Sequence, residues 1–94
     1  MSLTFEWDEN KARENLQKHK VSFEEAKAIF DDPFLMTYPD PDHSESEQRY
    51  LSVGSSSAGR VLLVIHTDRS ANTRIISCRK ATASERKHYE EKAF

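Results

Sequence analysis

The segment RVLLVIHT at residues 60–67 carries apolar side chains on both faces of a potential strand. Such a pattern favours a central strand of a sheet, because both faces of a central strand are covered. Turn-forming residues flank the segment, GSSSAG at 54–59 and DRSAN at 68–72. Strands joined by so few residues are antiparallel neighbours, since a parallel crossover needs about a dozen residues. We therefore predict neighbouring strands at Arg49–Val53 and Thr73–Lys80.

Upstream of these strands, the sequence predicts a strand and two helices. The alternation in LTFEW predicts a short strand over residues 3–7. Asp8 can then cap a helix that ends at His19. Ser22 and Glu25 have the spacing of a capping box, which predicts the start of a second helix. That helix ends ahead of the following proline, because the residue before a proline avoids helical geometry.

The remaining elements are a strand, a loop and a final helix. We predict a strand at Phe34–Tyr38, an acidic loop over residues 39–45, and a helix that starts at the capping box of Thr82 and Glu85. The order is then β-α-α-β-β-β-β-α in a single domain of residues 1–94. Consecutive short-linked strands with separate helices are typical of the α+β class. We predict a small twisted antiparallel sheet with the helices packed on it.

The composition predicts a small core. The chain has 94 residues, of which 36% are hydrophobic, and it has one cysteine, which excludes an internal disulfide and a cysteine-rich zinc site. The longest apolar run has five residues, far fewer than the roughly 20 of a transmembrane helix. The N-terminus lacks the basic and apolar regions of a signal peptide. We expect a cytoplasmic domain that does not associate with a membrane. A partner subunit is expected to supplement its small hydrophobic core.

Charge is distributed unevenly along the chain. The net charge is −2, which by itself argues against nucleic-acid binding. Residues 31–47 carry six acidic residues and no Lys or Arg, whereas residues 48–89 carry eight Lys or Arg and two acidic residues. Six of the eight are arginine, which binds phosphate through two parallel hydrogen bonds. The basic half is either an anion-binding face or a set of solvated strand edges, and composition leaves both open.

Basic residues at strand ends are the strongest candidates for chemistry. Arg60 and His66 share one face of the central strand, and plain alternation puts Arg74 and Lys80 together on one face of the last strand, with Arg79 on the other. Such side chains can converge on one phosphate and stabilise the charge of a pentacoordinate intermediate. The histidine can transfer a proton near neutral pH. This set suffices for metal-free RNA cleavage by the 2′-hydroxyl; surface salt bridges and a hydrogen-bonded strand-end histidine are the alternatives.

Other site chemistries have little support in the sequence. The chain has no P-loop or dinucleotide-binding glycine pattern, and its histidines lack the spacing of a helical zinc pair. His43 lies among four acidic residues, where a weak metal site is less favoured than a solvated acidic loop. Cys78 in the last strand is expected to be a small buried hydrophobic residue.

Several segments together resemble BrnT-type toxins. They are FEWDENK at 5–11, KHKVSFEEA at 18–26, DP at 32–33, HSE at 43–45, VIHT at 64–67 and RIISCRKAT at 74–82, with Arg49, Gly54, Gly59, Arg60, Glu85, Arg86, Tyr89 and Glu90 between and after them. The sequence departs from the family pattern at Lys20, where glycine is usual, and at Cys78, where alanine is usual. Lys20 in place of glycine predicts that the end of the first helix is strained or closed differently.

The resemblance implies a RelE-like fold and a bacterial ribonuclease toxin that stops translation. It implies a BrnA-like antitoxin partner, whose ribbon-helix-helix arm binds operator DNA, and an assembly that is a dimer of toxin–antitoxin heterodimers. It implies neither a cofactor nor a metal. The residues that we carry over as catalytic are Arg60, His66, Arg79, Lys80 and Glu85, and those that we carry over as RNA-binding are Arg49, Arg74, Arg86 and Lys11. The alternatives are a non-catalytic module that acts only within a DNA-bound complex and a domain that poisons DNA gyrase.

Overall fold

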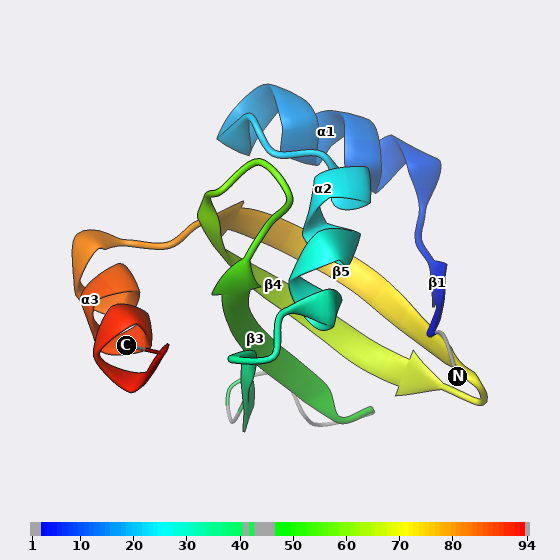
Figure 1. Cartoon of the computed structure of the whole chain (residues 1–94). Helices are drawn as coiled ribbons and strands as arrows, with labels where there is room; N and C mark the ends of the chain where they lie inside the picture. The colour runs from blue at the N-terminus through cyan, green and yellow to red at the C-terminus, as the bar shows by residue number, and fades with distance from the viewer. Residues whose placement is uncertain (1–2, 41, 43–46, 94) are drawn as a thin grey trace.

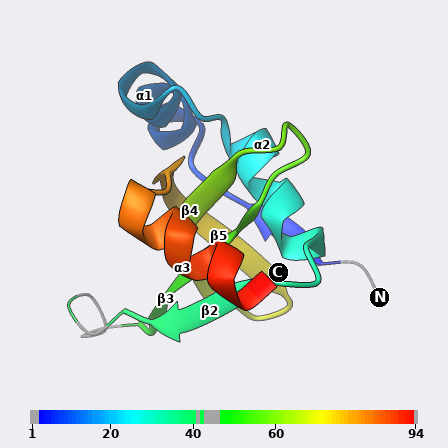
Figure 2. The ribbon, with the colours of Figure 1, turned by 60° about the vertical axis from the view of Figure 1, so that its left-hand side comes forward.

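The computed structural model describes residues 3–40, 42 and 47–93. Five strands form one sheet in the order β1-β5-β4-β3-β2. Helices α1 and α2 lie on one side of the sheet (Figure 1), and α3 lies across the strands on the other side (Figure 2). The elements are β1 (Thr4–Glu6), α1 (Glu9–His19), α2 (Phe23–Lys27), the 3₁₀ helix η1 (Ala28–Asp31), β2 (Met36–Pro39), β3 (Arg49–Ser55), β4 (Val61–Arg69), β5 (Asn72–Lys80) and α3 (Ala83–Ala93).

The predicted α+β class and the predicted order of elements are confirmed. The prediction of an antiparallel sheet is wrong for β1, which pairs in parallel with β5, with Phe5 opposite Thr73, so the sheet is mixed. The argument from short turns covers only the consecutive strands β2 to β5, and their pairings are antiparallel. Two helices separate β1 from β2 in the sequence, so no turn length constrains the direction of β1.

Side-chain caps set the starts of the helices. The Asp8 carboxylate accepts hydrogen bonds from the backbone N–H groups of Asn10 and Lys11, at 2.8 and 3.2 Å, as the sequence predicts. The Ser22 hydroxyl accepts from the Glu25 N–H at 3.0 Å, but the Glu25 carboxylate does not return to Ser22 and instead binds Arg60. No helix in the described ranges is long and apolar enough to cross a membrane.

The core is divided between the two faces of the sheet. On one face, α2 and η1 bury Phe23, Ala26 and Ile29 against β4 and β5, including Leu62 and Cys78. On the other face a smaller cluster contains Val53 of β3, Leu63 of β4 and Tyr89 of α3. The Tyr89 hydroxyl donates to the carboxylate of Asp32, which ties α3 to the end of η1. The central strand β4 is therefore covered on both faces, which confirms the prediction from its sequence.

A β-bulge in β5 interrupts the alternation of its side chains. Ile65 of β4 pairs with Ser77, whereas the next residue, His66, pairs with Ile75. Ile76 is therefore left without a partner across the strand pair. One extra residue on a strand reverses the face of every residue beyond it.

The bulge corrects the predicted faces of the basic residues on β5. Plain alternation predicts that Arg74 and Lys80 share a face, and this prediction is wrong. Lys80 pairs with Leu62 and so lies on the face that α2 covers, because residues opposite each other on paired strands share a face. Arg79 pairs with Leu63 on the α3 face, and Arg74 lies on that same α3 face before the bulge.

The first helix closes with a left-handed residue that is not glycine. Lys20 has φ 61° and ψ 30°, and its N–H donates to the Leu16 carbonyl at 3.0 Å. This is the ordinary αL helix end, in which glycine is preferred because a Cβ atom is strained there. The predicted strain at Lys20 is therefore present in the backbone, while the closure itself is normal.

We predict that Lys20→Gly stabilises the fold. Removing the Cβ atom from a left-handed residue relieves steric strain, and we expect the free energy of unfolding in urea to rise by about 1 kcal/mol. Lys18→Gly, a control inside the same helix, is expected to lower it by about 1 kcal/mol. If both variants lower the free energy of unfolding, the strain at Lys20 is not the controlling feature of this helix end.

Candidate nucleic-acid interface

A basic groove lies at the edge of the sheet where β4 begins and β5 ends. It is a hollow of about 550 Å³, and its charged lining consists of Arg60, Lys80, Arg86 and Glu90. Arg60 directly precedes β4, Lys80 ends β5, and the other two come from α3. We call this feature the basic groove. Three cations facing one hollow attract a polyanion, because the low-dielectric walls focus their field.

A larger hollow of about 740 Å³ lies beside β1 and α2. It is lined largely by apolar and aromatic side chains, including Phe5, Trp7 and Phe30. Among the described residues that line it, Lys27 is the only cation, and Lys27 lies 3.3 Å from a Glu24 oxygen. This hollow therefore lacks the charge that a phosphate backbone requires.

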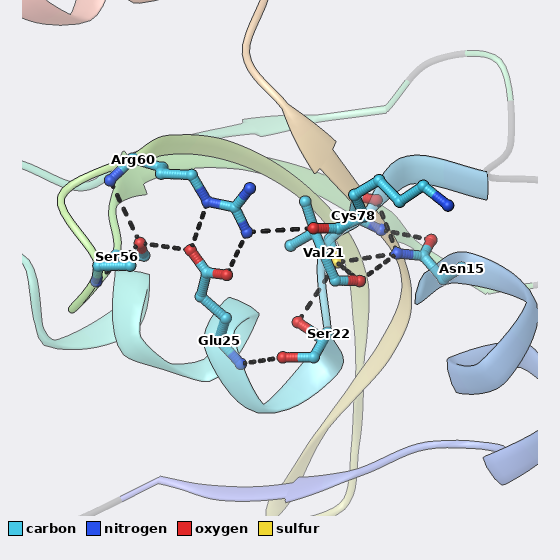
Figure 3. Close-up of polar contacts among 9 residues, drawn as sticks. Asn15, Val21, Ser22, Glu25, Ser56, Arg60 and Cys78 are labelled. Carbon is cyan, nitrogen blue, oxygen red and sulfur yellow. Dashed lines mark hydrogen bonds and ion pairs between the residues drawn. The ribbon is translucent and has the colours of Figure 1, made fainter. Parts of the chain in front are cut away.

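Arg60 is held at the rim of the basic groove by a half-buried carboxylate. Its Nε donates to Glu25 Oε2 at 2.9 Å, and its Nη2 donates to Oε1 of the same carboxylate (Figure 3). Nη2 also donates to the Lys20 carbonyl at 3.2 Å. The Ser56 hydroxyl donates to Glu25 Oε2 at 2.7 Å. These bonds join α2, the end of α1 and the loop before β4.

The cations around the groove act on the carboxylate of Glu25. The hydrogen bonds from Arg60 hold the pKa of the Glu25 carboxyl below its usual value, and the charge of Lys80 lowers it further. Lys80 lines the same groove as Arg60. It is exposed, and it extends from the last residue of β5 on the face that Arg60 occupies. Arg86 lies across the groove, with its Nε 3.5 Å from Glu90 Oε1.

The structure separates Arg79 and Arg74 from the groove, so the predicted convergence of four basic residues is wrong. Arg79 lies on the α3 face and makes a bidentate contact with Glu85, at 2.8 and 3.0 Å. That contact also occupies Glu85, whose carboxylate completes the predicted capping box. Arg74 lies near the opposite end of β5 and pairs with Glu6 at 2.9 Å. The bulge and the acidic partners are the two physical reasons.

Two further predicted RNA-binding residues also lie elsewhere. Arg49 is opposite Thr67, at the far end of β4 from the groove. Lys11 lies on α1 beside a hollow of about 250 Å³, which is also lined by Lys18 and by Ser77. Of the residues predicted to bind RNA, Arg86 alone lines the basic groove.

His66 is a buried structural residue. It is 5% exposed, its Nε2 lies 2.7 Å from the Ser52 hydroxyl, and its ring packs against those of Phe30 and Tyr50. Its Nδ1 has no hydrogen-bond partner among the described atoms. His66 lies five residues along β4 from Val61, which lines the groove, a distance of about 17 Å. The alternative of a hydrogen-bonded histidine therefore describes His66 better than a role in proton transfer.

In the described ranges, no group of three or more His, Cys, Asp or Glu side chains could hold a metal ion. His43 lies outside those ranges.

Glu25, which binds Arg60 behind the groove, is the residue that the sequence interpretation missed. The capping-box spacing from Ser22 already accounts for a glutamate at this position. No local signal therefore indicates that the Glu25 carboxylate binds a residue 35 positions away.

The fold and the groove define a small α+β protein with a hollow lined by basic residues at one edge of its sheet. A family model described as "Ribonuclease toxin, BrnT, of type II toxin-antitoxin system" matches residues 7–85. The chain therefore belongs to the BrnT family of ribonuclease toxins of type II toxin–antitoxin systems. The fold is also similar to the 1.1 Å crystal structure of the Brucella abortus ribonuclease toxin BrnT, with a TM-score of 0.63 and 20% identity over 86% of this chain and 99% of that one. No curated protein matches this chain.

We predict that His66 makes stability depend on pH. Burial lowers the pKa of His66 below its usual value of 6.5, so the unfolded chain binds this proton more readily than the folded protein. The free energy of unfolding should therefore fall as the pH decreases through about 6.5. His66→Gln should reduce the difference between urea unfolding at about pH 7.5 and about pH 5.5.

His88→Gln, a change at an exposed histidine of α3, is the matched control and should leave the pH difference in place. The assignment to His66 would be contradicted if both variants reduced the pH dependence of the free energy of unfolding equally. It would also be contradicted if neither variant reduced it.

Proposed function

We propose that this chain is the toxin of a type II toxin–antitoxin pair and a metal-independent endoribonuclease that inhibits translation in the cytoplasm. The observation that carries the proposal is the basic groove, in which Arg60 and Lys80 extend from neighbouring strands and face Arg86 of α3. Membership of a ribonuclease toxin family supports it independently. A BrnA-like antitoxin would neutralise the toxin, bind operator DNA and hold two toxin–antitoxin heterodimers together.

In this proposal the groove binds the phosphate at the scissile bond. The 2′-hydroxyl attacks its own phosphorus, and a cyclic phosphate forms as the 5′-oxygen of the next nucleotide leaves and takes up a proton from water. Arg60 and Lys80 stabilise the extra negative charge of the pentacoordinate phosphate, which is where preorganised donors have their largest effect. Glu90 is the carboxylate on the groove lining, so we assign it the proton of the 2′-hydroxyl in place of His66 or Glu85.

A non-catalytic role remains the second candidate, and a specific observation favours it. Arg60, Arg74 and Arg79 are each bound by a carboxylate, which reduces the charge available to a substrate. Under this alternative the chain serves only to assemble with its antitoxin on DNA. The free chain would then leave growth and RNA unchanged, while the complex would bind operator DNA.

We predict that the free chain arrests bacterial growth and cleaves RNA in the presence of EDTA. Lys80→Ala should lower the cleavage rate by about 100-fold, because it removes a cation that faces the phosphate. Arg69→Ala removes the same charge at the opposite end of β4, about 23 Å from Leu62, and should leave cleavage unchanged. RNA gels and growth curves measure both.

Cleavage that is absent from the unmutated chain, with and without ribosomes, would contradict the nuclease proposal. Altered DNA supercoiling without RNA cleavage would indicate a gyrase poison instead. Equal losses in the Lys80 and Arg69 variants would show that the groove is not the site.

A further inference from the structure

We infer that Glu25 is a positioning residue, which fixes the guanidinium of Arg60 so that its Nη1 amino group is presented to a phosphate oxygen in the basic groove. The inference rests on the proposed function, since it concerns the same groove. It adds a residue from α2 whose side chain does not line the groove and that acts on the substrate through another residue.

The donors of Arg60 support this assignment. A guanidinium has five N–H donors and no acceptor. Nε–H and one Nη2–H are directed at Glu25, and the Lys20 carbonyl accepts from Nη2 as well. Two donors remain, both on Nη1, and Figure 3 shows no dashed line at that nitrogen. Arg60 is 32% exposed and lines the groove, so the remaining donors belong to a group that solvent reaches.

Glu25 is itself fixed firmly enough to act as a template. Its side chain is 16% exposed, and Ser56 donates to the same carboxylate oxygen that receives Nε of Arg60. The Ser56 hydroxyl also accepts from the backbone N–H of Ala58 at 3.2 Å. The backbone of Glu25 is held in turn by the Ser22 cap. A donor whose orientation is set before substrate binds loses less conformational entropy on binding.

The same contact has an opposite interpretation, in which Glu25 competes with the phosphate for Arg60. Displacing the carboxylate would leave its oxygens in a largely buried position with only Ser56 as a partner, which is costly for a charged group. Burial therefore favours positioning over competition. The two roles also predict opposite effects, because removing a negative charge beside the groove strengthens RNA binding unless the orientation of Arg60 matters more.

The test measures binding of a 2′-O-methyl RNA oligonucleotide, which cannot be cleaved, by fluorescence anisotropy. Glu25→Gln should weaken binding by about tenfold despite the lost negative charge, because the amide nitrogen cannot accept from Arg60. In an Arg60→Ala background the same substitution should cause no further loss. Glu6→Gln, which breaks a comparable ion pair at the other end of the sheet, is the matched control and should not weaken binding.

Urea unfolding of each variant accompanies these measurements. If Glu25→Gln does not fold, Ser56→Ala removes one hydrogen bond from the carboxylate and should weaken binding about threefold. Tighter binding by Glu25→Gln, or an equal loss in the Arg60→Ala background, overturns the inference. Unmodified RNA of the same sequence that binds the unmutated chain and is not cleaved contradicts the nuclease proposal and leaves the binding test valid. RNA that does not bind the unmutated chain overturns both.

Discussion

The unpaired residue Ile76 in β5 determines which side of the sheet each basic residue of that strand occupies. Ile75 and Cys78 are three positions apart, so strict alternation would place them on opposite faces of the sheet. With the extra residue, both pack into the core under α2. Lys80 then follows Cys78 on the same face, where Arg60 lies at the start of β4. Without the bulge, Lys80 would lie on the α3 face, opposite to the face that α2 covers. Core packing and the arrangement of the groove are thus set by one irregularity.

A buried amide fixes the strand beside this irregularity. Asn15 of α1 donates to the carbonyls of Val21 and Cys78 at 3.0 and 2.9 Å, and it accepts from the Cys78 N–H at 3.1 Å. A fully satisfied buried polar group rigidifies its surroundings, whereas an unsatisfied one is costly. The helix end that presents the Lys20 carbonyl to Arg60 is therefore tied to the strand that ends in Lys80. Arg60 and Lys80 therefore extend from segments that the same network holds together.

Much of the local structure follows from the sequence, because caps and turns are local. Asp8, Ser22 and Thr82 each begin a helix where the sequence predicts one, and the central strand lies where its apolar run predicts it. Long-range features could not be predicted in the same way. The bulge is a property of the pairing between two strands, and the parallel direction of β1 follows from the path of two helices.

The candidate site shows the same division. Residue type indicates Arg60 and Lys80, which line one groove, yet the number of side chains in that groove depends on which arginines have carboxylates nearby in space. The sequence does not specify that Glu85 takes Arg79 or that Glu6 takes Arg74, because one contact crosses from strand to helix and the other joins opposite ends of the chain. His66 has the right chemistry for proton transfer, and only the fold reveals that packing buries it.

An NMR titration of the ¹⁵N-labelled protein with a short 2′-O-methyl RNA locates the anion-binding surface directly. We expect the largest shifts at the backbone amides of Gly59, Val61 and Ala81 and at the Nε of Arg60, which surround the basic groove. Shifts concentrated at Arg49, Arg69 and Asn72, at the opposite end of the sheet, would contradict this location and the function that we derive from it.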